Sequence, residues 1–414
     1  MPSMRSLVAV VLDRGSASPA EIVLSARKLC DVVFVCDGSR PDGAEALSAA
    51  RELAAVCDVT GLTEAEAITA VARLQPDGIT TFSEYQLRRT ADLAAALDLP
   101  FHTPEVADVL TDKLRQRAVV NAAGVDATKC RVITDIDDLP VVLAEIGFPA
   151  IVKPRHGAGS TDTYRVRSLA EATAAVGAFF GAADDPRDFV VEEMLVGDPS
   201  IAGTEWGDYV SVESVATHGH IRHVCVTGKL PLAWPFRETG MVVPAALPAA
   251  WTQSVCDLAD AAIRALGIRV GVTHTEIKLT ADGPRLIEVN GRMGGYVSEL
   301  IQRGSGYDLR RAVLEAALGR SVEPPPLTFT GVAYQYLLTA PPGATRLVRL
   351  AETSEILAVA GVRDVTVTAR PGQPMGWRSG TEGKLGMVRG EATDHTSAAA
   401  GIAEIESLWR PVYE

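Results

Sequence analysis

The sequence predicts an α/β fold with a doubly wound parallel sheet at the N-terminus, followed by α+β units built on antiparallel sheets. Two observations predict this class. Short apolar runs alternate with helical stretches over the first hundred residues, and residues 149–290 contain strands joined by short turns. Continuous apolar strands between helices are typical of parallel sheets covered on both faces, whereas strands joined by hairpins are antiparallel.

The N-terminal strands are expected at residues 7–12, 31–37, 57–59 and 78–82, with helices near 18–29, 43–55 and 63–74. No G-x-G-x-x-G follows the first strand, so dinucleotide binding there has little support. Ligands of such sheets bind beyond the carboxyl ends of the strands. That rule points to residues 13–16, to Asp37 and Gly38, and to Ser83 and Glu84, which are equally ordinary turn and cap residues.

The remainder of the chain is expected to form smaller α+β units. Helices are expected at 105–123, 136–146 and 248–266, and strands at 131–134, 149–154, 164–166, 189–195, 209–216 and 220–230. Residues 196–208 have the composition of an inserted polar loop, and the proline-rich stretch 322–327 marks a boundary. We therefore expect four units: a Rossmann-like domain (1–110), a small lobe (111–195), a large lobe (196–325) and a small C-terminal sheet subdomain (326–414).

Composition and charge exclude several classes of protein. The 414 residues include 39 Lys and Arg against 52 Asp and Glu, a net charge of −13, whereas a nucleic-acid footprint needs a basic face. The six cysteines form no Cys-x-x-Cys pair, which indicates reduced thiols rather than a zinc site or a disulfide framework. No apolar stretch approaches the roughly 20 residues of a membrane helix. We expect a cytoplasmic protein with neither a nucleic-acid nor a membrane partner.

The most informative stretch is 274–295, HTEIKLTADGPRLIEVNGRMGG. Two strand-like runs flank Ala281-Asp282-Gly283, which predicts a β-hairpin with a three-residue turn and Gly283 in the left-handed position. This register pairs Glu276 with Glu288, His274 with Asn290, and Lys278 with Leu286 on one face. Two carboxylates about 4 Å apart repel by about 4 kcal/mol at an effective dielectric of about 20, so a cation is expected between them.

Glu276, Glu288 and the Asn290 amide form a hard-oxygen ligand set of the kind that Mg²⁺ accepts beside nucleotide phosphates. A two-residue Asp-Gly turn would shift the register by one and send the acids to opposite faces. Opposed acids also occur on solvated sheets, so the hairpin alone leaves both interpretations open. The segment 291–295, GRMGG, favours a phosphate ligand, because a guanidinium beside glycines can approach it closely.

A second group of residues also has the pattern of a nucleotide site. Lys153 ends an apolar strand just before the glycine-rich segment 156–161. A lysine beside a loop rich in backbone N–H donors suits nucleotide phosphates, although Lys-Pro also ends strands without any function. Glu192 and Glu193 alternate on the next strand, so one of them faces inward, either to contact adenine or ribose or as a structural group.

The order of these motifs resembles the ATP-grasp superfamily of carboxylate–amine ligases. The motifs are Asp112-Lys113, AGV at 123–125, PAIVKP with Lys153, GAGST at 157–161, VVEEML, and TEIKL followed by IEVNGRMGG. The stretches VTGKLPLAWPFRETG and GWRSGTEGKLGMVRG make the chain most similar to the L-amino acid ligases, which join amino acids into dipeptides. The resemblance covers roughly residues 1–320 and implies an ATP-grasp fold whose central and C-terminal lobes clasp ATP.

The resemblance also implies roles for individual residues. Phosphate binding falls to Lys113, Lys153, Gly157, Ala158, Gly159, Ser160 and Thr161. Adenine and ribose contacts fall to Glu192, Glu193, Met194, Leu195 and, beyond the insertion, Asp208. The ligands of Mg²⁺, normally two ions with Mn²⁺ as a substitute, are Glu276, Glu288 and Asn290, and the transition-state groups are Arg292, Gly294 and Gly295. Substrate contacts are expected from Ser83, Glu84, Glu213, Trp234, Arg237 and His274. The superfamily often has proline where this chain has Gly291, which puts the local rigidity in doubt.

The implied activity is ATP-dependent dipeptide formation through an acyl phosphate, with ADP and phosphate as by-products. Its setting would be specialised metabolism such as antibiotic biosynthesis, and homodimers are common in the family. A carboxylating ATP-grasp enzyme or another carboxylate–amine ligase is an alternative. A nucleotide-binding regulatory protein is a third interpretation, against which the intact set Glu276, Glu288, Asn290 and Arg292 argues. The sequence identifies neither the two amino acids nor whether an α- or a γ-carboxylate is activated.

Overall fold

The computed structural model describes residues 5–39, 41–180 and 187–414. The N-terminal domain is a four-stranded parallel sheet in the order β3-β2-β1-β4, which confirms the predicted fold class. Its strands are β1 (Leu7–Leu12), β2 (Asp31–Cys36), β3 (Ala55–Asp58) and β4 (Gly78–Thr81). Its helices are α1 (Pro19–Ala26), α2 (Pro41–Arg51), α3 (Glu64–Ala72), α4 (Leu87–Leu97) and α5 (Pro104–Leu110), with a short 3₁₀ turn η1 (Glu84–Gln86).

The single helix predicted over 105–123 is wrong, because α5 ends at Leu110 and a new helix, α6 (Lys113–Ala122), begins. The Asp112 side chain accepts hydrogen bonds from the backbone N–H groups of Leu114 and Arg115. Such an N-cap satisfies the free donors of a helix start, so it starts a second helix in a new direction. The break places Lys113 and Arg117 on a helix of their own.

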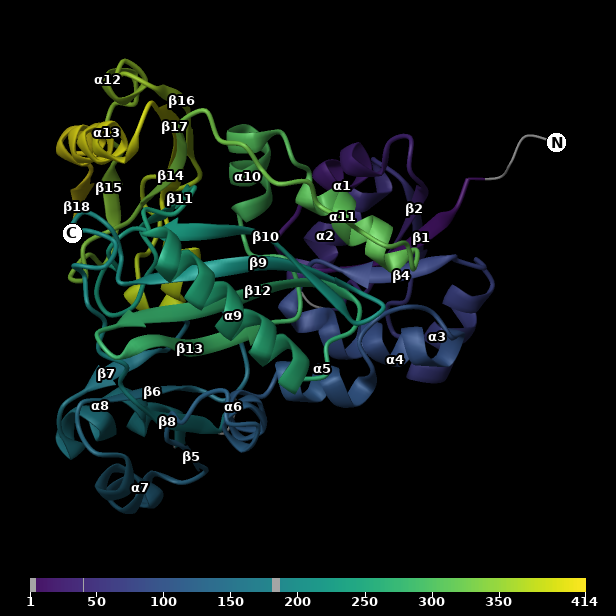
Figure 1. Cartoon of the computed structure of the whole chain (residues 1–414), viewed down its shortest axis with the longest axis horizontal. Coiled ribbons are helices and arrows are strands. Elements are labelled where there is room, and N and C mark those ends of the chain that lie inside the picture. Colours follow the sequence, from purple (N-terminus) through teal and green to yellow (C-terminus); the bar gives the residue numbers. More distant parts are fainter. Residues whose placement is uncertain (1–4, 40, 181–186) are drawn as a thin grey trace.

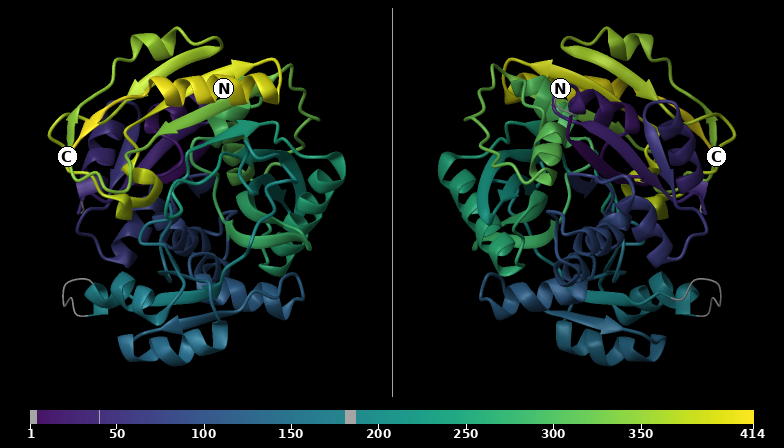
Figure 2. Two further views of the ribbon diagram at one scale, coloured as in Figure 1. Left: turned by 90° about the vertical axis from the view of Figure 1, so that its left-hand side faces the viewer. Right: turned by 90° about the vertical axis from the view of Figure 1, so that its right-hand side faces the viewer.

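The small lobe is an antiparallel sheet in the order β5-β8-β6-β7 with helices on one side. Its strands are β5 (Cys130–Ile133), β6 (Ala150–Pro154), β7 (Tyr164–Val166) and β8 (Phe189–Glu193), and its helical segments are η2 (Ile136–Asp138), α7 (Leu139–Ile146) and α8 (Leu169–Phe180). In Figure 2 this lobe is a separate layer below the rest of the molecule.

The large lobe is built on an eight-stranded sheet in the order β13-β12-β9-β10-β11-β14-β17-β16. Its strands are β9 (Tyr209–Thr217), β10 (His220–Lys229), β11 (Gly240–Val243), β12 (Gly271–Thr280), β13 (Gly283–Asn290), β14 (Val332–Leu338), β16 (Val362–Val367) and β17 (Gly386–Ala392). Strands from beyond residue 326 therefore continue the sheet that carries the hairpin. The hairpin forms one edge of this sheet (Figure 1).

Helices cover this sheet and join it to its neighbours. Helix α9 (Ala249–Ala265) packs through Val255 and Ile263 on Ile277 and Leu286 of the hairpin. Helices α10 (Val297–Ser305) and α11 (Leu309–Ala317) share one hydrophobic core with the N-terminal sheet. The C-terminal subdomain adds β15 (Leu347–Arg349), α12 (Ser354–Leu357), the 3₁₀ segment η3 (Trp377–Gly383), α13 (His395–Leu408) and β18 (Val412–Tyr413). Helix α9 therefore covers one face of the hairpin.

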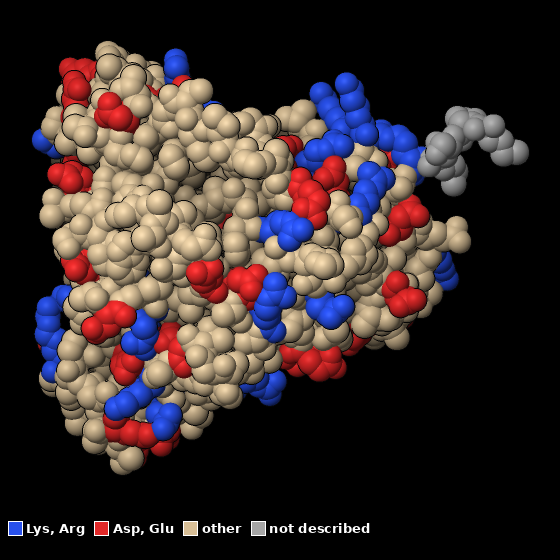
Figure 3. All heavy atoms as spheres, in the orientation of Figure 1, with Lys and Arg blue, Asp and Glu red and all other residues tan. Residues whose placement is uncertain are grey.

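The surface of the molecule carries both signs of charge. On the face in Figure 3, basic and acidic side chains are interspersed rather than gathered by sign. Within the described ranges 5–39, 41–180 and 187–414, no helix is long and apolar enough to cross a membrane.

Candidate active site

The hairpin brings the predicted metal ligands together. His274 lies opposite Asn290 and Glu276 opposite Glu288, which confirms both pairs. The predicted route to this register is wrong, however. The closing pair is Thr280 with Gly283, so the turn has two residues, and Lys278 pairs with Arg285 rather than Leu286. Gly283 does adopt a positive φ, of 112°.

A β-bulge at Ile287 restores the register that the short turn would have lost. Ile277 pairs with Leu286 and the next residue, Glu276, with Glu288, so Ile287 is the extra residue. A bulge inserts one residue into one strand and re-aims the side chains beyond it. Without it, a two-residue turn would have placed the two glutamates on opposite faces.

Helix α6 covers the edge strand at the bulge. Arg117 donates from Nη1 to the carbonyl oxygen of Leu286 (2.9 Å) and from Nη2 to that of Ile287 (2.7 Å). Gln116 exchanges two hydrogen bonds with the backbone of Val289, at 2.8 and 2.9 Å. These side chains satisfy edge groups of β13 that a regular strand would leave unpaired.

Sequence reasoning missed both residues, although one signal was present. Gln116 and Arg117 occupy positions on the same helical face as Val120, where an amphipathic helix normally carries apolar residues. Buried polar residues on an otherwise apolar face indicate specific partners.

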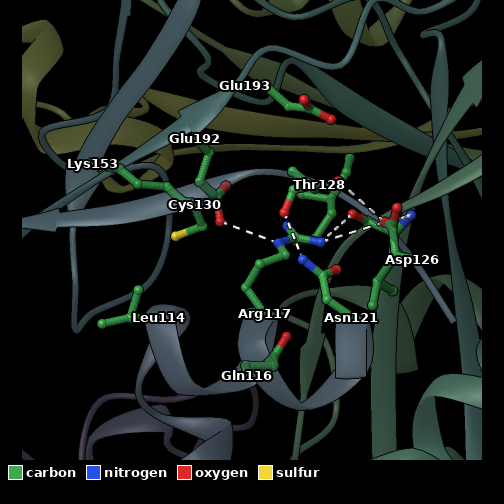
Figure 4. A network of polar contacts seen from close by, with 12 residues as sticks. Leu114, Gln116, Arg117, Asn121, Asp126, Thr128, Cys130, Lys153, Glu192 and Glu193 are labelled. Atoms are coloured by element: carbon green, nitrogen blue, oxygen red, sulfur yellow. Dashed lines mark hydrogen bonds and ion pairs between the residues drawn. The ribbon is translucent and has the colours of Figure 1, made fainter. Parts of the chain in front are cut away.

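Arg117 also belongs to a buried charge cluster with Lys153 and Glu192 (Figure 4). The Glu192 carboxylate lies 2.7 Å from Lys153 Nζ and 3.3 Å from Arg117 Nε. Burial alone would raise the pKa of Glu192, but the two cations outweigh it and lower the pKa to about 2. Burial opposes the charge of Lys153 too, whereas Glu192 and Glu288 raise its pKa. Glu192 is thus the inward-facing acid of β8, while Glu193 is paired with Arg285 at 3.3 Å.

This cluster predicts a loss of stability in acid. The unfolded chain takes up a proton on Glu192 near its ordinary pKa, whereas the folded carboxylate stays charged until about pH 2. The contribution of Glu192 is therefore present above pH ~4.5 and falls as the pH drops toward 2. Urea unfolding at pH 3 and pH 6 measures it. Glu192→Gln should reduce the difference between the two, and Glu193→Gln, on the adjacent residue, should not. Equal pH dependence in both variants would contradict the assignment.

The glycine-rich segment contacts a lysine that lines the same cavity as this cluster. Lys113 Nζ donates to the carbonyl oxygen of Gly157 at 2.6 Å. Gly157 and Gly159 have φ values of 113° and 71°, which glycine adopts without strain, and Ser160 follows with a φ of 56°. Lys113, Lys153 and Glu288 line one small cavity. The structure therefore brings together the predicted phosphate-binding lysines and a predicted metal ligand.

Arg292 lies at the end of the hairpin with carboxylate and amide partners. Its Nε is 3.1 Å from Glu84 of the N-terminal domain, and its Nη2 donates to Asn290 Oδ1 at 3.1 Å. Burial raises the pKa of Glu84, and Arg292 opposes that rise. The doubt over Gly291 has a structural answer. Its carbonyl oxygen lies 2.7 Å from His102 Nε2, and a Cβ there would lie 2.5 Å from Leu110, so this backbone is confined without proline.

His274 lies between two acids on the face of the sheet opposite α9. Its Nδ1 is 2.9 Å from Glu213, and its Nε2 is 3.4 Å from Glu276. Burial lowers the pKa of His274, but Glu213 and Glu276 outweigh it and raise the pKa to about 9. Burial likewise raises the pKa of Glu276, yet His274, Lys229 and Arg292 lower it to about 2. Gly294 packs on this ring, since a Cβ there would lie 2.4 Å from His274 Nδ1.

Two lysines flank Tyr209 on the same face. Lys278 and Lys229 each place Nζ 5.8 Å from the Tyr209 ring centre, and they pair with Asp208 (2.6 Å) and Glu238 (2.7 Å) respectively. Lys229, which is 1% exposed, was also missed, although a lone lysine in the apolar run VCVTGKL is a signal for it. Asp208, the predicted ribose acid, is already paired with Lys278.

The unpartnered polar atoms on this face fit a polar ligand. Among the described residues, the hydroxyl groups of Tyr209 and Ser211 are buried without a hydrogen-bond partner. Ser211 lies opposite Glu276 in the sheet. Buried polar groups are normally satisfied, so these two hydroxyl groups are available to a ligand or to water.

The remaining predicted residues follow strands β4, β8 and β10. Ser83 donates to the carbonyl oxygen of Arg14. Met194 and Leu195 follow β8 and are half-buried. Trp234 is 50% exposed, whereas Arg237 is 3% exposed and donates to the carbonyl oxygen of Trp234. Arg237 therefore makes its contacts within its own loop rather than at the hairpin.

The hairpin residues suit a divalent cation whose other ligands come from a nucleotide. In the part of the chain that the structure describes, no group of three or more His, Cys, Asp and Glu side chains could hold a metal ion. Glu276 and Glu288 supply only two carboxylates, and Asn290 adds an amide oxygen. Mg²⁺ commonly takes one or two carboxylates and completes its shell with phosphates and water, so this donor set fits it.

Comparison with known proteins assigns the architecture. Residues 146–299 match the ATP-grasp domain family. The L-amino acid ligase from Bacillus licheniformis superposes with a TM-score of 0.80 at 20% identity, covering 100% of both chains. The chain has the ATP-grasp fold. The matched residues include strand β6 with Lys153 and the hairpin with Glu276 and Glu288.

Curated relatives of this chain include enzymes named as ligases and synthases. Alanine–anticapsin ligase from Bacillus subtilis is 29% identical over 252 residues, 58% of this chain and 53% of that protein. Carnosine synthase 1 from Gallus gallus is 32% identical over 187 residues, 42% of this chain and 19% of that protein. The chain thus spans about half, or less, of the length of these relatives.

Proposed function

We propose that the protein is an ATP-dependent ligase that joins the carboxylate of one amino acid to the amine of another, releasing ADP and phosphate. The observation that carries this proposal is the pairing of Glu276 with Glu288 beside Lys113, Lys153 and Arg292. Together these residues supply acids for a cation, lysines for phosphates, and a guanidinium for the groups that react. The name of alanine–anticapsin ligase supports an amino acid as the acyl donor.

The residues fit a reaction through an acyl phosphate. A carboxylate is a poor electrophile, and phosphorylation by ATP converts it into a good one. Lys113, Lys153 and the 157–161 loop would hold the phosphates, and Glu276, Glu288 and Asn290 would hold Mg²⁺. When bound, Mg²⁺ neutralises charge on the phosphates.

The end of the hairpin fits the second half of the reaction. The amine attacks the acyl carbon, a tetrahedral oxyanion forms, and phosphate leaves. Arg292, held by Glu84 and Asn290, and the amides of Gly294 and Gly295 would stabilise that oxyanion. Glu213 and His274 are candidates to orient the amine. Water must be kept from the acyl phosphate, for which the 157–161 loop and the 196–208 insertion are candidate covers.

Other assignments belong to the same proposal. Adenine would be bordered by Glu192, Glu193, Met194 and Leu195. Asp208 would bind ribose with a carboxylate oxygen that does not contact Lys278. Ser83, Trp234 and Arg237 would border the amino acids. Two Mg²⁺ ions would bind, and Mn²⁺ would serve as a substitute for them. The protein would act as a cytoplasmic homodimer in the synthesis of a specialised metabolite.

One assay tests the function. The protein is incubated with ATP, Mg²⁺ and pooled amino acids, and phosphate and product masses are measured, with amino acids omitted in the control. We expect phosphate to appear together with masses of dipeptides. Phosphate release that does not depend on amino acids, or no release at all, would contradict the proposal.

A further inference from the structure

A segment of the C-terminal subdomain reaches the glycine-rich loop. Segment η3 lies between β16 and β17. The backbone N–H of Thr381 donates to the carbonyl oxygen of Gly159 at 3.0 Å, and the N–H of Asp162 donates to the carbonyl oxygen of Arg378 at 3.2 Å. The loop of the small lobe is therefore held from the opposite end of the chain.

The same segment holds the loop that joins β10 to β11, residues 230–239. The Glu238 backbone N–H donates to Thr381 Oγ1 at 3.3 Å, and Trp377 lies edge-on to Trp234 with ring centres 4.7 Å apart. Glu238 in turn pairs with the buried Lys229 at 2.7 Å. Thr381, which is 5% exposed, thus contacts two loops. Its backbone N–H binds the 157–161 loop, on the phosphate side of the site, and its hydroxyl binds the 230–239 loop, on the substrate side.

Gly380 makes this close approach possible. Its φ is 60°, and a Cβ at this position would lie 2.0 Å from the Gly159 carbonyl oxygen and 2.8 Å from the Ser160 carbonyl carbon. Any other residue would therefore be strained and would also push the glycine-rich loop away. The contact depends on this glycine for two independent reasons.

We propose that Thr381 is a positioning residue that closes the 157–161 loop and the 230–239 loop together over the reacting groups. The proposal rests on the proposed ligase function. With both loops closed as a unit, nucleotide binding orders the substrate side before the acyl phosphate forms. Loss of the Thr381 hydroxyl would leave the phosphate side closed and the substrate side open to water, so ATP would be spent on hydrolysis.

Hydrogen exchange at the Glu238 amide tests the link without requiring any ligase activity. The wild type, Thr381→Ala, Thr381→Ser and Gly380→Ala are compared with and without ADP and Mg²⁺. In the wild type and in Thr381→Ser we expect ADP to slow exchange over 230–239. In Thr381→Ala the Glu238 amide should exchange about fivefold faster than in the wild type, and ADP should no longer slow its exchange. Exchange over 157–161 should still be slowed by ADP in this variant. Gly380→Ala should lose the response at both loops.

The ratio of phosphate released to dipeptide formed is the second measurement. We expect this ratio to rise about fivefold in Thr381→Ala and to equal the wild-type value in Thr381→Ser. The control Thr366→Ala, at an exposed position of β16, should leave the ratio unchanged. Unaltered exchange at Glu238 in Thr381→Ala, or a lower melting temperature with an unaltered response to ADP, overturns the proposal. A wild type that binds ADP and orders both loops but forms no dipeptide would reject the ligase function alone.

Discussion

Glu288→Gln abolishes product formation while the protein remains folded. The substitution keeps the shape of the side chain and removes one of the two carboxylates that face each other across the hairpin. A neutral amide is a poorer ligand for a hard cation and leaves charge on the phosphates uncompensated. We expect the rate of dipeptide formation to fall by at least about 100-fold, a loss typical of removing one preorganised stabilising group.

The matched control is Glu323→Gln, which removes an acid whose side chain is 62% exposed and pairs with Arg222. Its rate and its urea unfolding curve should equal those of the wild type. Dipeptide formation by Glu288→Gln at the wild-type rate would reject the metal assignment, and with it the mechanism.

Arg117→Met has the largest expected effect on stability. Arg117 is buried, contacts Glu192 and Asp126, and donates to two carbonyl groups at the bulge of β13. Methionine fills much of the volume but leaves two buried carboxylates each without one partner and two carbonyls without donors. Removing one member of a buried charge cluster costs about 3–5 kcal/mol.

Arg115→Met, two residues away on the same helix, is the control, because the Arg115 side chain is 57% exposed. It should change the free energy of unfolding by less than about 1 kcal/mol. Urea unfolding of both variants measures the difference, and ADP binding by Arg117→Met should weaken as the bulge loosens. Equal stability of the two variants would show that Arg117 does not support the bulge.

The hairpin shows how far sequence reasoning reached. It predicted that Glu276 faces Glu288, but through a three-residue turn that the structure does not contain. The structure reaches the same pairing through a two-residue turn and a bulge at Ile287. A bulge leaves little mark in the sequence, since it depends on donors from another element. Here those donors are on Arg117, which is 170 residues away in the chain.

Several site residues were predictable only in part. Lys153 and Glu192 were predicted from residue type and spacing, and the structure brings them together with Glu288. The glycine-rich segment, also predicted, contacts Lys113, which lines the same cavity. Ser83 and Glu84 were indicated by the strand-end rule alone. The ion pair between Glu84 and Arg292 depends on how the N-terminal domain packs against the large lobe, which no local pattern encodes.

The sequence by itself determined the fold class, the order of the motifs and the residue types that the hairpin carries, because these depend on local periodicity and on residue types at short spacing. Only the tertiary structure decided the register-restoring bulge, the neutralisation of Glu192 by two cations, and the contact of Thr381 with both loops. Each of these joins residues far apart in the chain. Their partners are set by packing between lobes, and packing depends on the whole chain at once.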